Sequence, residues 1–219
     1  VYTAAIHPDN PEFACVIEKK IPMLTRAQLL GQIMKNYGTP IAVSGTHGKT
    51  TTTSLASHVL MAGNCDPTIS VGGILPSIHG NIRVGSSDVF ITEACEYTNS
   101  FLSFFPKISL ILNVDADHLD FFKDIDDIRR SFHAFGKLLP ADGTLIINAD
   151  TPKYEAIIKG LDCEVLTYGL EQEADYRAQD ITFNELGHPS FTCLFRGEAI
   201  GSFTLHIPGM HNVSNALAT

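Results

Sequence analysis

Short apolar runs recur along the first three quarters of the chain and alternate with longer segments whose apolar residues follow a helical period. The apolar runs predict strands at residues 41–44, 68–71, 89–92, 108–114, 144–148 and 164–168. The segments with helical spacing predict helices at residues 26–37, 49–61, 125–139 and 152–159. Because strands that alternate with helices form parallel pairs covered on both faces, we predict an α/β fold with a mainly parallel sheet and flanking helices.

The pattern changes near residue 174. Three alternating runs, separated by turn residues, follow at residues 176–183, 190–195 and 199–206. Runs of this kind predict a small antiparallel β-sheet in addition to the parallel one. Residues 207–219 indicate a turn that enters a helix, and residues 1–6 indicate the tail of a strand that runs into a loop.

Composition and charge restrict the class of partner. The chain of 219 residues has a formal net charge of −9 and no cluster of Lys or Arg. Because binding a nucleic-acid backbone needs a basic face, we expect no nucleic-acid partner. No apolar run approaches the roughly 18 residues that a membrane span needs, so we expect no membrane insertion. Five scattered cysteines without paired spacing argue against a disulfide framework or a zinc site, and indicate buried thiols in a reducing cytosol.

A glycine-rich segment, GTHGKT, starts at Gly45, directly after a predicted strand, and leads into a predicted helix. Two glycines allow a tight turn whose backbone N–H groups face phosphate oxygens, and the helix N-terminus adds its positive dipole end. Lys49 can reach the β- and γ-phosphates of ATP, and the Thr50 hydroxyl can reach Mg²⁺. The match is incomplete, because the usual spacing has Gly where this chain has Val43. The alternative interpretation is a glycine-rich helix start with a solvated lysine. We predict a site for ATP and Mg²⁺ whose contacts come from Gly45, Thr46, His47, Gly48, Lys49, Thr50 and Thr51.

Two further strand ends carry candidate catalytic groups. Glu93 follows the apolar run at 89–92, and His118 lies in the segment NVDADHLD that follows the run at 108–112. Ligands of α/β sheets collect at the carboxyl ends of the strands, so both side chains are expected beside the phosphate loop. Glu93 is a candidate Mg²⁺ ligand, and His118 is a candidate for a second metal or for orienting a reacting group. Taken singly, each residue is better interpreted as a strand-end polar residue or a helix cap, but three strand ends that carry a phosphate loop, an acid and a His in one sheet favour the functional interpretation.

Four separated segments, GTHGKTTTTS, EACEYTNSFL, NVDADHLDFF and PGMHNVSNALA, resemble in order the ATP-dependent Mur ligases of peptidoglycan synthesis. The resemblance is greatest to the branch that joins L-alanine to UDP-N-acetylmuramate. It implies ATP and Mg²⁺ as cofactors, UDP-N-acetylmuramate and L-alanine as substrates, and a bacterial cytoplasmic location. It also implies three domains in the family. On that comparison, residues 1–12 are the tail of an N-terminal UDP-sugar-binding domain, residues 13–219 are the central ATP-binding domain, and the C-terminal amino-acid-binding domain is absent.

The resemblance also implies roles for single residues. Lys49 matches the lysine that neutralises the transferring phosphoryl group, Thr50 and Glu93 match Mg²⁺ ligands, and His118 matches a histidine on the metal and substrate side. Asn212 and Asn215 match an amide pair that approaches adenine, although they could also cap the last helix. Where several Mur ligases have a carbamylated lysine, this chain has His133, with Lys137 one turn later.

Two alternative functions remain open on the sequence. One is a recycling ligase that attaches a tripeptide to the same sugar nucleotide, and the other is an ATP-binding module without ligation. Glu93 and His118 favour a catalytic function over a nucleotide-binding switch. Nucleotide sensing alone does not need an additional carboxylate and imidazole opposite the phosphate loop. Glu96, Asn99 and Ser100 follow Glu93 and are candidates to face the sugar-lactyl group, with a loop or helix cap as the alternative.

Overall fold

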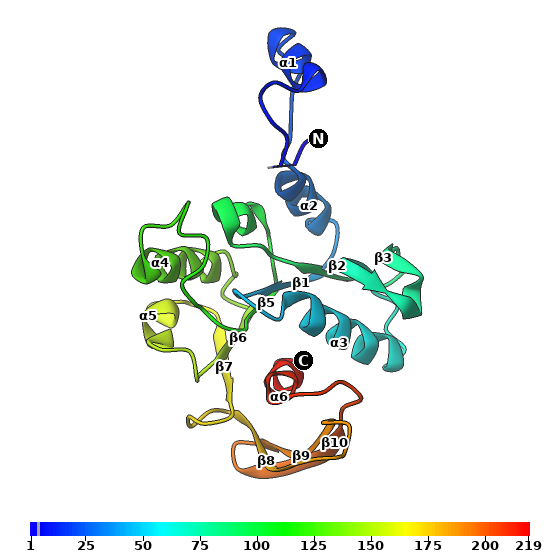
Figure 1. Cartoon of the computed structure of the whole chain (residues 1–219), viewed down its shortest axis with the longest axis vertical. Helices are drawn as coiled ribbons and strands as arrows, with labels where there is room; N and C mark the ends of the chain where they lie inside the picture. Colours follow the sequence, from blue (N-terminus) through cyan, green and yellow to red (C-terminus); the bar gives the residue numbers. More distant parts are fainter. Residues whose placement is uncertain (4) are drawn as a thin grey trace.

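The structure is a computed structural model that describes residues 1–3 and 5–219. Its strands form one ten-stranded sheet in the order β10-β9-β8-β7-β6-β5-β1-β4-β2-β3 (Figure 1). The strands are β1 (Thr39–Ser44), β2 (Thr68–Leu75), β3 (Gly80–Arg83), β4 (Val89–Glu93), β5 (Ile108–Ile111), β6 (Thr144–Asn148), β7 (Glu164–Gly169), β8 (Tyr176–Phe183), β9 (Pro189–Phe195) and β10 (Glu198–Thr204). The helices are α1 (Pro11–Glu18), α2 (Arg26–Met34), α3 (Lys49–Ala62), α4 (Ile125–Gly136), α5 (Tyr154–Ile158) and α6 (Met210–Leu217), with short 3₁₀ segments η1 (Pro76–Ile78) and η2 (Tyr97–Ser103).

The central strands are parallel, and their side chains alternate between two apolar layers. Ala42 of β1 and Ile111 of β5 belong to a buried cluster with residues of α2, η2, α4 and α5. Val43 and Leu110, one position away on the same strands, belong to a second buried cluster with residues of α3 and α6. This two-residue alternation is the property that lets a parallel strand bury both faces. The predicted α/β class, with helices on both faces of a mainly parallel sheet, is confirmed.

The antiparallel strands continue the parallel sheet instead of forming a sheet of their own. β8 pairs with β7 in parallel through only two residue pairs, Tyr168 with Tyr176 and Gly169 with Arg177. Antiparallel pairing then connects β8 to β9 and β9 to β10. Figure 1 shows these three strands at one end of the molecule, with α6 between them and α3. The predicted strand positions are therefore right, and the separation into two sheets is wrong.

The N-terminal region differs most from the prediction. The strand expected at residues 1–6 is reduced to a single bridge between Tyr2 and Thr25, and residue 4 lies outside the described part of the chain. Helix α1 was not predicted; it begins after Asn10, whose side chain accepts hydrogen bonds from the N–H groups of Glu12 and Phe13. None of its residues is buried. In Figure 1, α1 projects away from the sheet, so little of the fold depends on it.

Two expectations drawn from composition have different outcomes. Cys15 and Cys95 are exposed, so the expectation of uniformly buried thiols is wrong. In the described ranges 1–3 and 5–219, none of the helices combines the length and apolar character needed to cross a bilayer.

The strand order determines where the candidate site lies. β1 is flanked by β4 and β5, and all three run parallel. Their carboxyl ends therefore lie side by side. Lys49 and His118 lie in the segments that follow β1 and β5, and Glu93 is the last residue of β4. The sheet thus brings together three segments that are far apart in the sequence.

Candidate active site

The phosphate loop has the backbone that its glycines predict. Gly45 and Gly48 have φ angles of 141° and 86°, in the region that favours glycine. A Cβ atom on Gly48 would lie 2.7 Å from Oδ1 of Asn215, so packing as well as backbone angle excludes a side chain there. Helix α3 starts at Lys49 without a side-chain cap, which leaves its first N–H groups available to an anion. A pocket of about 280 Å³ is lined by residues 46–51.

The end of β5 fixes the loop in place. The Asn113 side chain accepts a hydrogen bond from the N–H of His47 at 2.7 Å and donates one to its carbonyl oxygen at 3.0 Å. The Thr46 hydroxyl accepts a hydrogen bond from the N–H of Asp115 at 3.0 Å, and the Thr46 N–H donates to the Asn113 carbonyl at 3.1 Å. The His47 contacts that hold the loop are therefore made by its backbone N–H and carbonyl groups. Asn113 was not among the predicted site residues.

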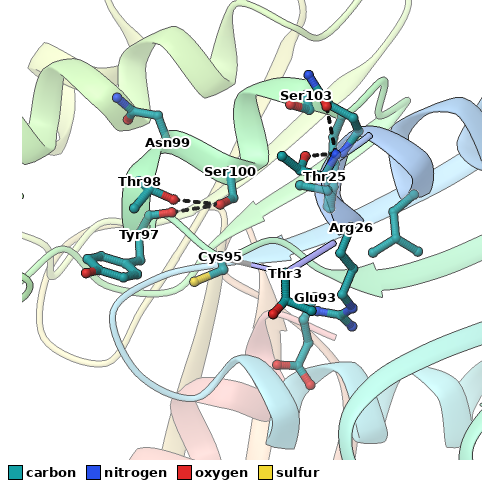
Figure 2. A pocket seen from close by; sticks show the side chains of 14 residues that line it. Thr3, Thr25, Arg26, Glu93, Cys95, Tyr97, Thr98, Asn99, Ser100 and Ser103 are labelled. Atoms are coloured by element: carbon teal, nitrogen blue, oxygen red, sulfur yellow. Dashed lines mark hydrogen bonds between the residues drawn. The ribbon is translucent and has the colours of Figure 1, made fainter. Parts of the chain in front are cut away.

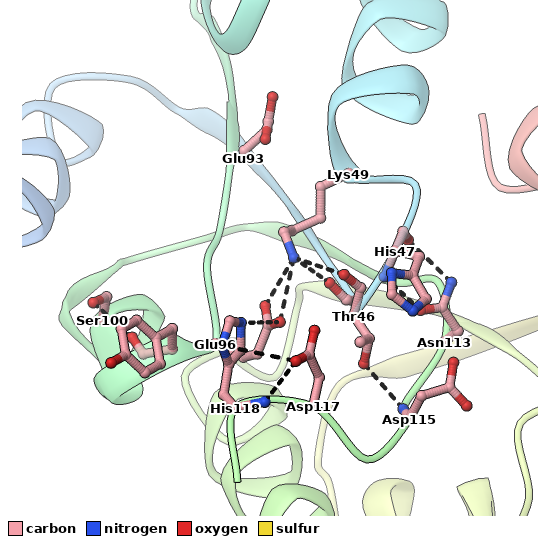
Figure 3. Close-up of polar contacts among 12 residues, drawn as sticks. Thr46, His47, Lys49, Glu93, Glu96, Ser100, Asn113, Asp115, Asp117 and His118 are labelled. Carbon is pink, nitrogen blue, oxygen red and sulfur yellow. Dashed lines mark hydrogen bonds and ion pairs between the residues drawn. The ribbon is translucent and has the colours of Figure 1, made fainter. Parts of the chain in front are cut away.

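Lys49, Glu96 and His118 form one group of charged and polar side chains (Figure 3). The Lys49 ammonium lies 3.0 and 3.3 Å from the two carboxylate oxygens of Glu96. Oε1 of that carboxylate, which lies 3.3 Å from the ammonium, also faces Nε2 of His118 at 3.7 Å. Glu96 is only 2% exposed, whereas the sequence suggested that it faces a sugar. Two predicted catalytic residues are therefore joined through a carboxylate that was not predicted to join them.

Glu93 and Thr50 form a second group. The Thr50 hydroxyl donates a hydrogen bond to Oε2 of Glu93 at 3.1 Å, and the N–H of Gly72 donates to Oε1. A hydroxyl oxygen and a carboxylate oxygen that converge beside a phosphate loop are hard donors, and they fit Mg²⁺ that also contacts phosphate oxygens. His118 contacts Glu96 and not this pair. Among the residues that the structure describes, no group of three His, Cys, Asp or Glu side chains has the arrangement of a metal site. The metal roles of Thr50, Glu93 and His118 therefore stay predictions.

The loop that carries His118 is ordered by aromatic and polar contacts. His118 has a φ angle of 52°, and its N–H donates to Oδ1 of Asp117 at 2.7 Å. The ring of Tyr97 lies 4.5 Å from the imidazole, centroid to centroid. The Tyr97 hydroxyl donates to Asp120 at 2.8 Å, and this hydrogen bond raises the pKa of Tyr97 above its usual value. The imidazole is thus held between an aromatic ring and the carboxylate of Glu96.

Asn212 and Asn215 lie on α6, beside the phosphate loop. Both are 7% exposed, and the amide of Asn215 donates to the side-chain oxygen of Asn212 at 3.1 Å. Asn212 in turn donates to the carbonyl of Pro208 at 2.8 Å. Neither side chain caps α6, because Gly209 occupies the N-cap position without a side-chain bond. Asn215 therefore lies next to Gly48, with Asn212 bonded to it, and contact of the pair with adenine stays a prediction.

His133 and Lys137 lie away from this site. The ring of His133 contacts the carbonyl of Ile157 at 2.8 Å, and the Lys137 ammonium donates to the carbonyl of Gly160. Both contacts are made to α5 and the turn that follows it. These contacts give no support to a carbamylated lysine near the phosphate loop.

A second pocket, of about 350 Å³, lies on the other side of Glu93 (Figure 2). Its walls come from the first turn of α2, from η2 and from the end of β4. Arg26 of α2 and Glu93 point into the same part of this pocket. Polar groups of the opposite wall belong to Thr98, Asn99 and Ser100. The pocket therefore adjoins the carboxylate that Thr50 contacts, and it has room for a polar molecule.

Comparisons with known proteins identify the family. A curated relative from Lachnospira eligens, named UDP-N-acetylmuramate--L-alanine ligase, is 59% identical over all 219 residues. The sequence model of the family described as Mur ligase middle domain matches residues 43–219. The chain belongs to this family. The chain spans about half the length of that relative, because the match covers 48% of it.

Solved structures agree with this assignment. The UDP-N-acetylmuramate-alanine ligase MurC from Thermotoga maritima superposes with a TM-score of 0.84 at 27% identity, covering 99% of this chain and 48% of that protein. A ligase for UDP-N-acetylmuramate and L-alanyl-γ-D-glutamyl-meso-diaminopimelate from Neisseria meningitides has a TM-score of 0.87 at 24% identity, covering 99% of this chain and 71% of that one. The second comparison, at 24% identity, supports the fold only.

Proposed function

We propose that this chain is the ATP-binding domain of a ligase that joins L-alanine to UDP-N-acetylmuramate, with release of ADP and phosphate. The observation that carries the proposal is the meeting of the phosphate loop, Glu93 with Thr50, and His118 at the ends of three adjacent parallel strands. The identity of 59% to a relative named for that reaction supports the choice of substrates.

The loop residues provide the phosphate chemistry. Backbone N–H groups at the start of α3 bind the phosphates of ATP, and the Lys49 ammonium balances the charge that develops on the γ-phosphoryl group. Thr50 and Glu93 hold Mg²⁺, which supplies positive charge to the same oxygens. Asn212 and Asn215 lie close enough to Gly48 to serve the adenosine part of the nucleotide.

The pocket beside Glu93 is suited to the acceptor. The lactyl carboxylate of UDP-N-acetylmuramate attacks the γ-phosphorus, ADP leaves, and an acyl phosphate forms. The amine of L-alanine then attacks the acyl carbon, phosphate leaves, and the amine loses a proton. Arg26 places a positive charge in this pocket, next to the Glu93 and Thr50 pair, where an attacking carboxylate needs to be held.

The remaining parts of the reaction are assigned to other domains. We propose that residues 13–219 form the central domain and that residues 1–12 end a preceding UDP-sugar-binding domain. Four apolar side chains that are close in the sequence and exposed around α1 support a further domain that packs there. They are Ile17, Ile21, Met23 and Leu24. The L-alanine site then belongs to a C-terminal domain, and we place the ligase in the bacterial cytoplasm, where ATP is supplied.

Two alternative functions can be distinguished from the proposed one by assay. The tripeptide ligase of the recycling type has the same fold, and the acceptor pocket of this chain does not distinguish the two amine donors. A nucleotide-binding module without ligation is disfavoured by the Lys49, Glu96 and His118 group, since phosphate binding alone needs no imidazole and buried carboxylate.

The test is a coupled assay of the full-length protein. ATP, Mg²⁺ and UDP-N-acetylmuramate are supplied with L-alanine or with the tripeptide, and amide and phosphate are both measured. Equal amounts of amide and phosphate with L-alanine support the proposal. Amide with the tripeptide alone moves the assignment to the recycling ligase, and ATP binding without any amide overturns ligation.

A further inference from the structure

Glu96 is a buried carboxylate in a site that has to bind polyphosphate. It is 2% exposed and lies three residues after the end of β4. A negative charge beside a phosphate loop repels the anion that the loop binds, so its presence opposes affinity for ATP. A group that opposes binding and is nevertheless buried there needs another role. We propose that Glu96 is a positioning residue that sets the places of the Lys49 ammonium and the His118 imidazole for phosphoryl transfer.

The contacts of Lys49 support this role first. The ammonium has three donors, and its neighbours are the carbonyl of Gly45 at 2.5 Å, the carbonyl of Thr46 at 3.2 Å and the Glu96 carboxylate at 3.0 Å. All three donors are therefore occupied before any nucleotide binds. ATP has to exchange at least one of these acceptors for a phosphate oxygen. The hydrogen-bond acceptors that Lys49 keeps after ATP binds then determine the direction of its ammonium group.

The second contact of Glu96 extends the same argument to another strand. Its Oε1 atom lies 3.3 Å from the Lys49 ammonium and 3.7 Å from Nε2 of His118. One carboxylate therefore spans the segments that follow β1 and β5, while its own backbone follows β4. Figure 3 shows the three side chains converging from these separate segments. Moving this carboxylate displaces the ammonium and the imidazole together.

The backbone around Glu96 holds the carboxylate rigidly. Its carbonyl accepts a hydrogen bond from the N–H of Asn99 at 2.9 Å, and the carbonyl of Cys95 accepts one from Phe101 at 3.0 Å. Phe101 is fully buried in the core and stacks on Phe135. The turn that carries Glu96 is thus anchored in the apolar layer beneath the sheet. Rigid support of this kind is what a positioning group needs.

The proposal rests on the ligase function proposed above, and it predicts a split between binding and turnover. In the full-length protein, Glu96→Gln keeps the shape of the side chain and removes its charge. We expect the Kd for Mg·ATP to fall several-fold because the repulsion is gone. We expect kcat to fall on the order of 100-fold, because misplaced catalytic groups lose that much. A loss of fold alone weakens binding and lowers turnover together.

Glu96→Asp separates charge from position. The shorter side chain keeps the charge and withdraws the carboxylate, so we expect near-normal affinity for ATP with kcat still reduced. Glu198→Gln, at an exposed position on β10, is the matched control and leaves both quantities unchanged. Thermal melting of each variant shows that the fold is retained.

The outcomes are distinguishable. If wild-type protein makes no amide, the proposed function fails, and nucleotide affinity of Glu96→Gln still tests whether the carboxylate opposes ATP. If wild-type protein is active and Glu96→Gln keeps kcat within about twofold of it, the positioning role is overturned. Weaker binding of ATP by folded Glu96→Gln also overturns it.

Discussion

The phosphate loop and the pocket lined by Arg26 meet at Glu93, but their polar groups are held in different ways. On the loop side, hydrogen bonds join residues that are distant in sequence, such as His47 to Asn113 and Lys49 to Glu96. On the pocket side, local bonds such as those between Thr98 and Ser100 or between Thr25 and Gln28 occur beside longer-range ones such as that from Ser131 to Asn99. In the part of the chain that the structure describes, the Arg26 side chain makes no hydrogen bond or ion pair.

The two sides of Glu93 therefore differ in how firmly they are held. We call the phosphate-loop side the nucleotide half and the side of the pocket lined by Arg26 the acceptor half of the proposed site. Bonds between separate strands fix the loop before a ligand arrives, so little conformational freedom is lost when phosphate binds. On the pocket side, Arg26 is an exposed cation in the first turn of α2, an end of the helix that favours negative rather than positive charge. We propose that this exposed cation faces the carboxylate of the acceptor. The phosphate loop is therefore held by long-range hydrogen bonds, and the proposal that the pocket receives the acceptor rests on Arg26.

The largest effect is expected at Lys49. In the full-length ligase, Lys49→Ala removes the ammonium beside the transferring phosphoryl group, so we expect kcat to fall on the order of 10²–10³-fold. Amide formation under saturating ATP measures it. Lys35→Ala, an exposed lysine after α2, is the control and retains full turnover. Turnover of Lys49→Ala close to wild type contradicts the assigned role of the loop.

Glu93→Gln tests the point where the two halves meet. The amide keeps the hydrogen bond from Thr50 but binds Mg²⁺ poorly, so we expect the Mg²⁺ concentration for half-maximal rate to rise about 10–100-fold. A Mg²⁺ titration of the rate measures this shift. An unchanged requirement for Mg²⁺ would remove Glu93 from the metal site and leave it as a support for Gly72.

Arg26→Ala tests the pocket alone. We expect KM for UDP-N-acetylmuramate to rise at least about tenfold, since a hydrogen bond to a charged group contributes about 1.5–3 kcal/mol. KM for ATP should not change, because Arg26 does not line the loop pocket. Initial rates with each substrate varied in turn give both constants, and Arg130→Ala at an exposed position on α4 is the control. Equal changes in both KM values would show that the two halves are not independent.

Asn113→Ala tests whether long-range bonds preorganise the loop. It removes two hydrogen bonds to His47, and we expect affinity for Mg·ATP to fall about fivefold to tenfold, at about 1 kcal/mol per bond or less. Calorimetric titration with ATP measures it. Undiminished affinity would mean that the loop holds its shape without β5.

The smallest effect concerns a carboxylate outside both halves. Hydrogen bonds from Ser86 and the neighbouring Arg83 lower the pKa of Asp66 from 3.8 to about 2. A lowered pKa stabilises the fold above the unfolded value near 4, and this contribution is lost as pH falls toward 2. Asp66→Asn should therefore reduce stability at neutral pH and flatten its decline below pH 4, which urea unfolding at several pH values measures. A change in ATP affinity would contradict the view that Asp66 lies outside the nucleotide site.

The sequence predicted features that depend on local geometry. The phosphate loop was predictable because two glycines before Lys49 specify a backbone turn, and the strands of β6 and β8 were predicted to the residue. Glu96 was not assigned to Lys49, because its burial arises only when η2 packs on α4. Asn113 was missed because its partner His47 lies 66 positions earlier in the chain, and only the folded sheet brings the two together. The continuity of β7 with β8 depends on two residue pairs that leave no pattern in the sequence.

The most direct test of the account uses the 219-residue chain itself. Mg·ATP is titrated into the chain and into its Lys49→Ala variant, and UDP-N-acetylmuramate and L-alanine are then added while amide is measured. We predict that the chain binds Mg·ATP, that Lys49→Ala weakens this binding, and that no amide forms. Amide synthesis by this chain, or an absence of Mg·ATP binding by the folded chain, would contradict the claim that it carries a complete nucleotide half and a partial acceptor half.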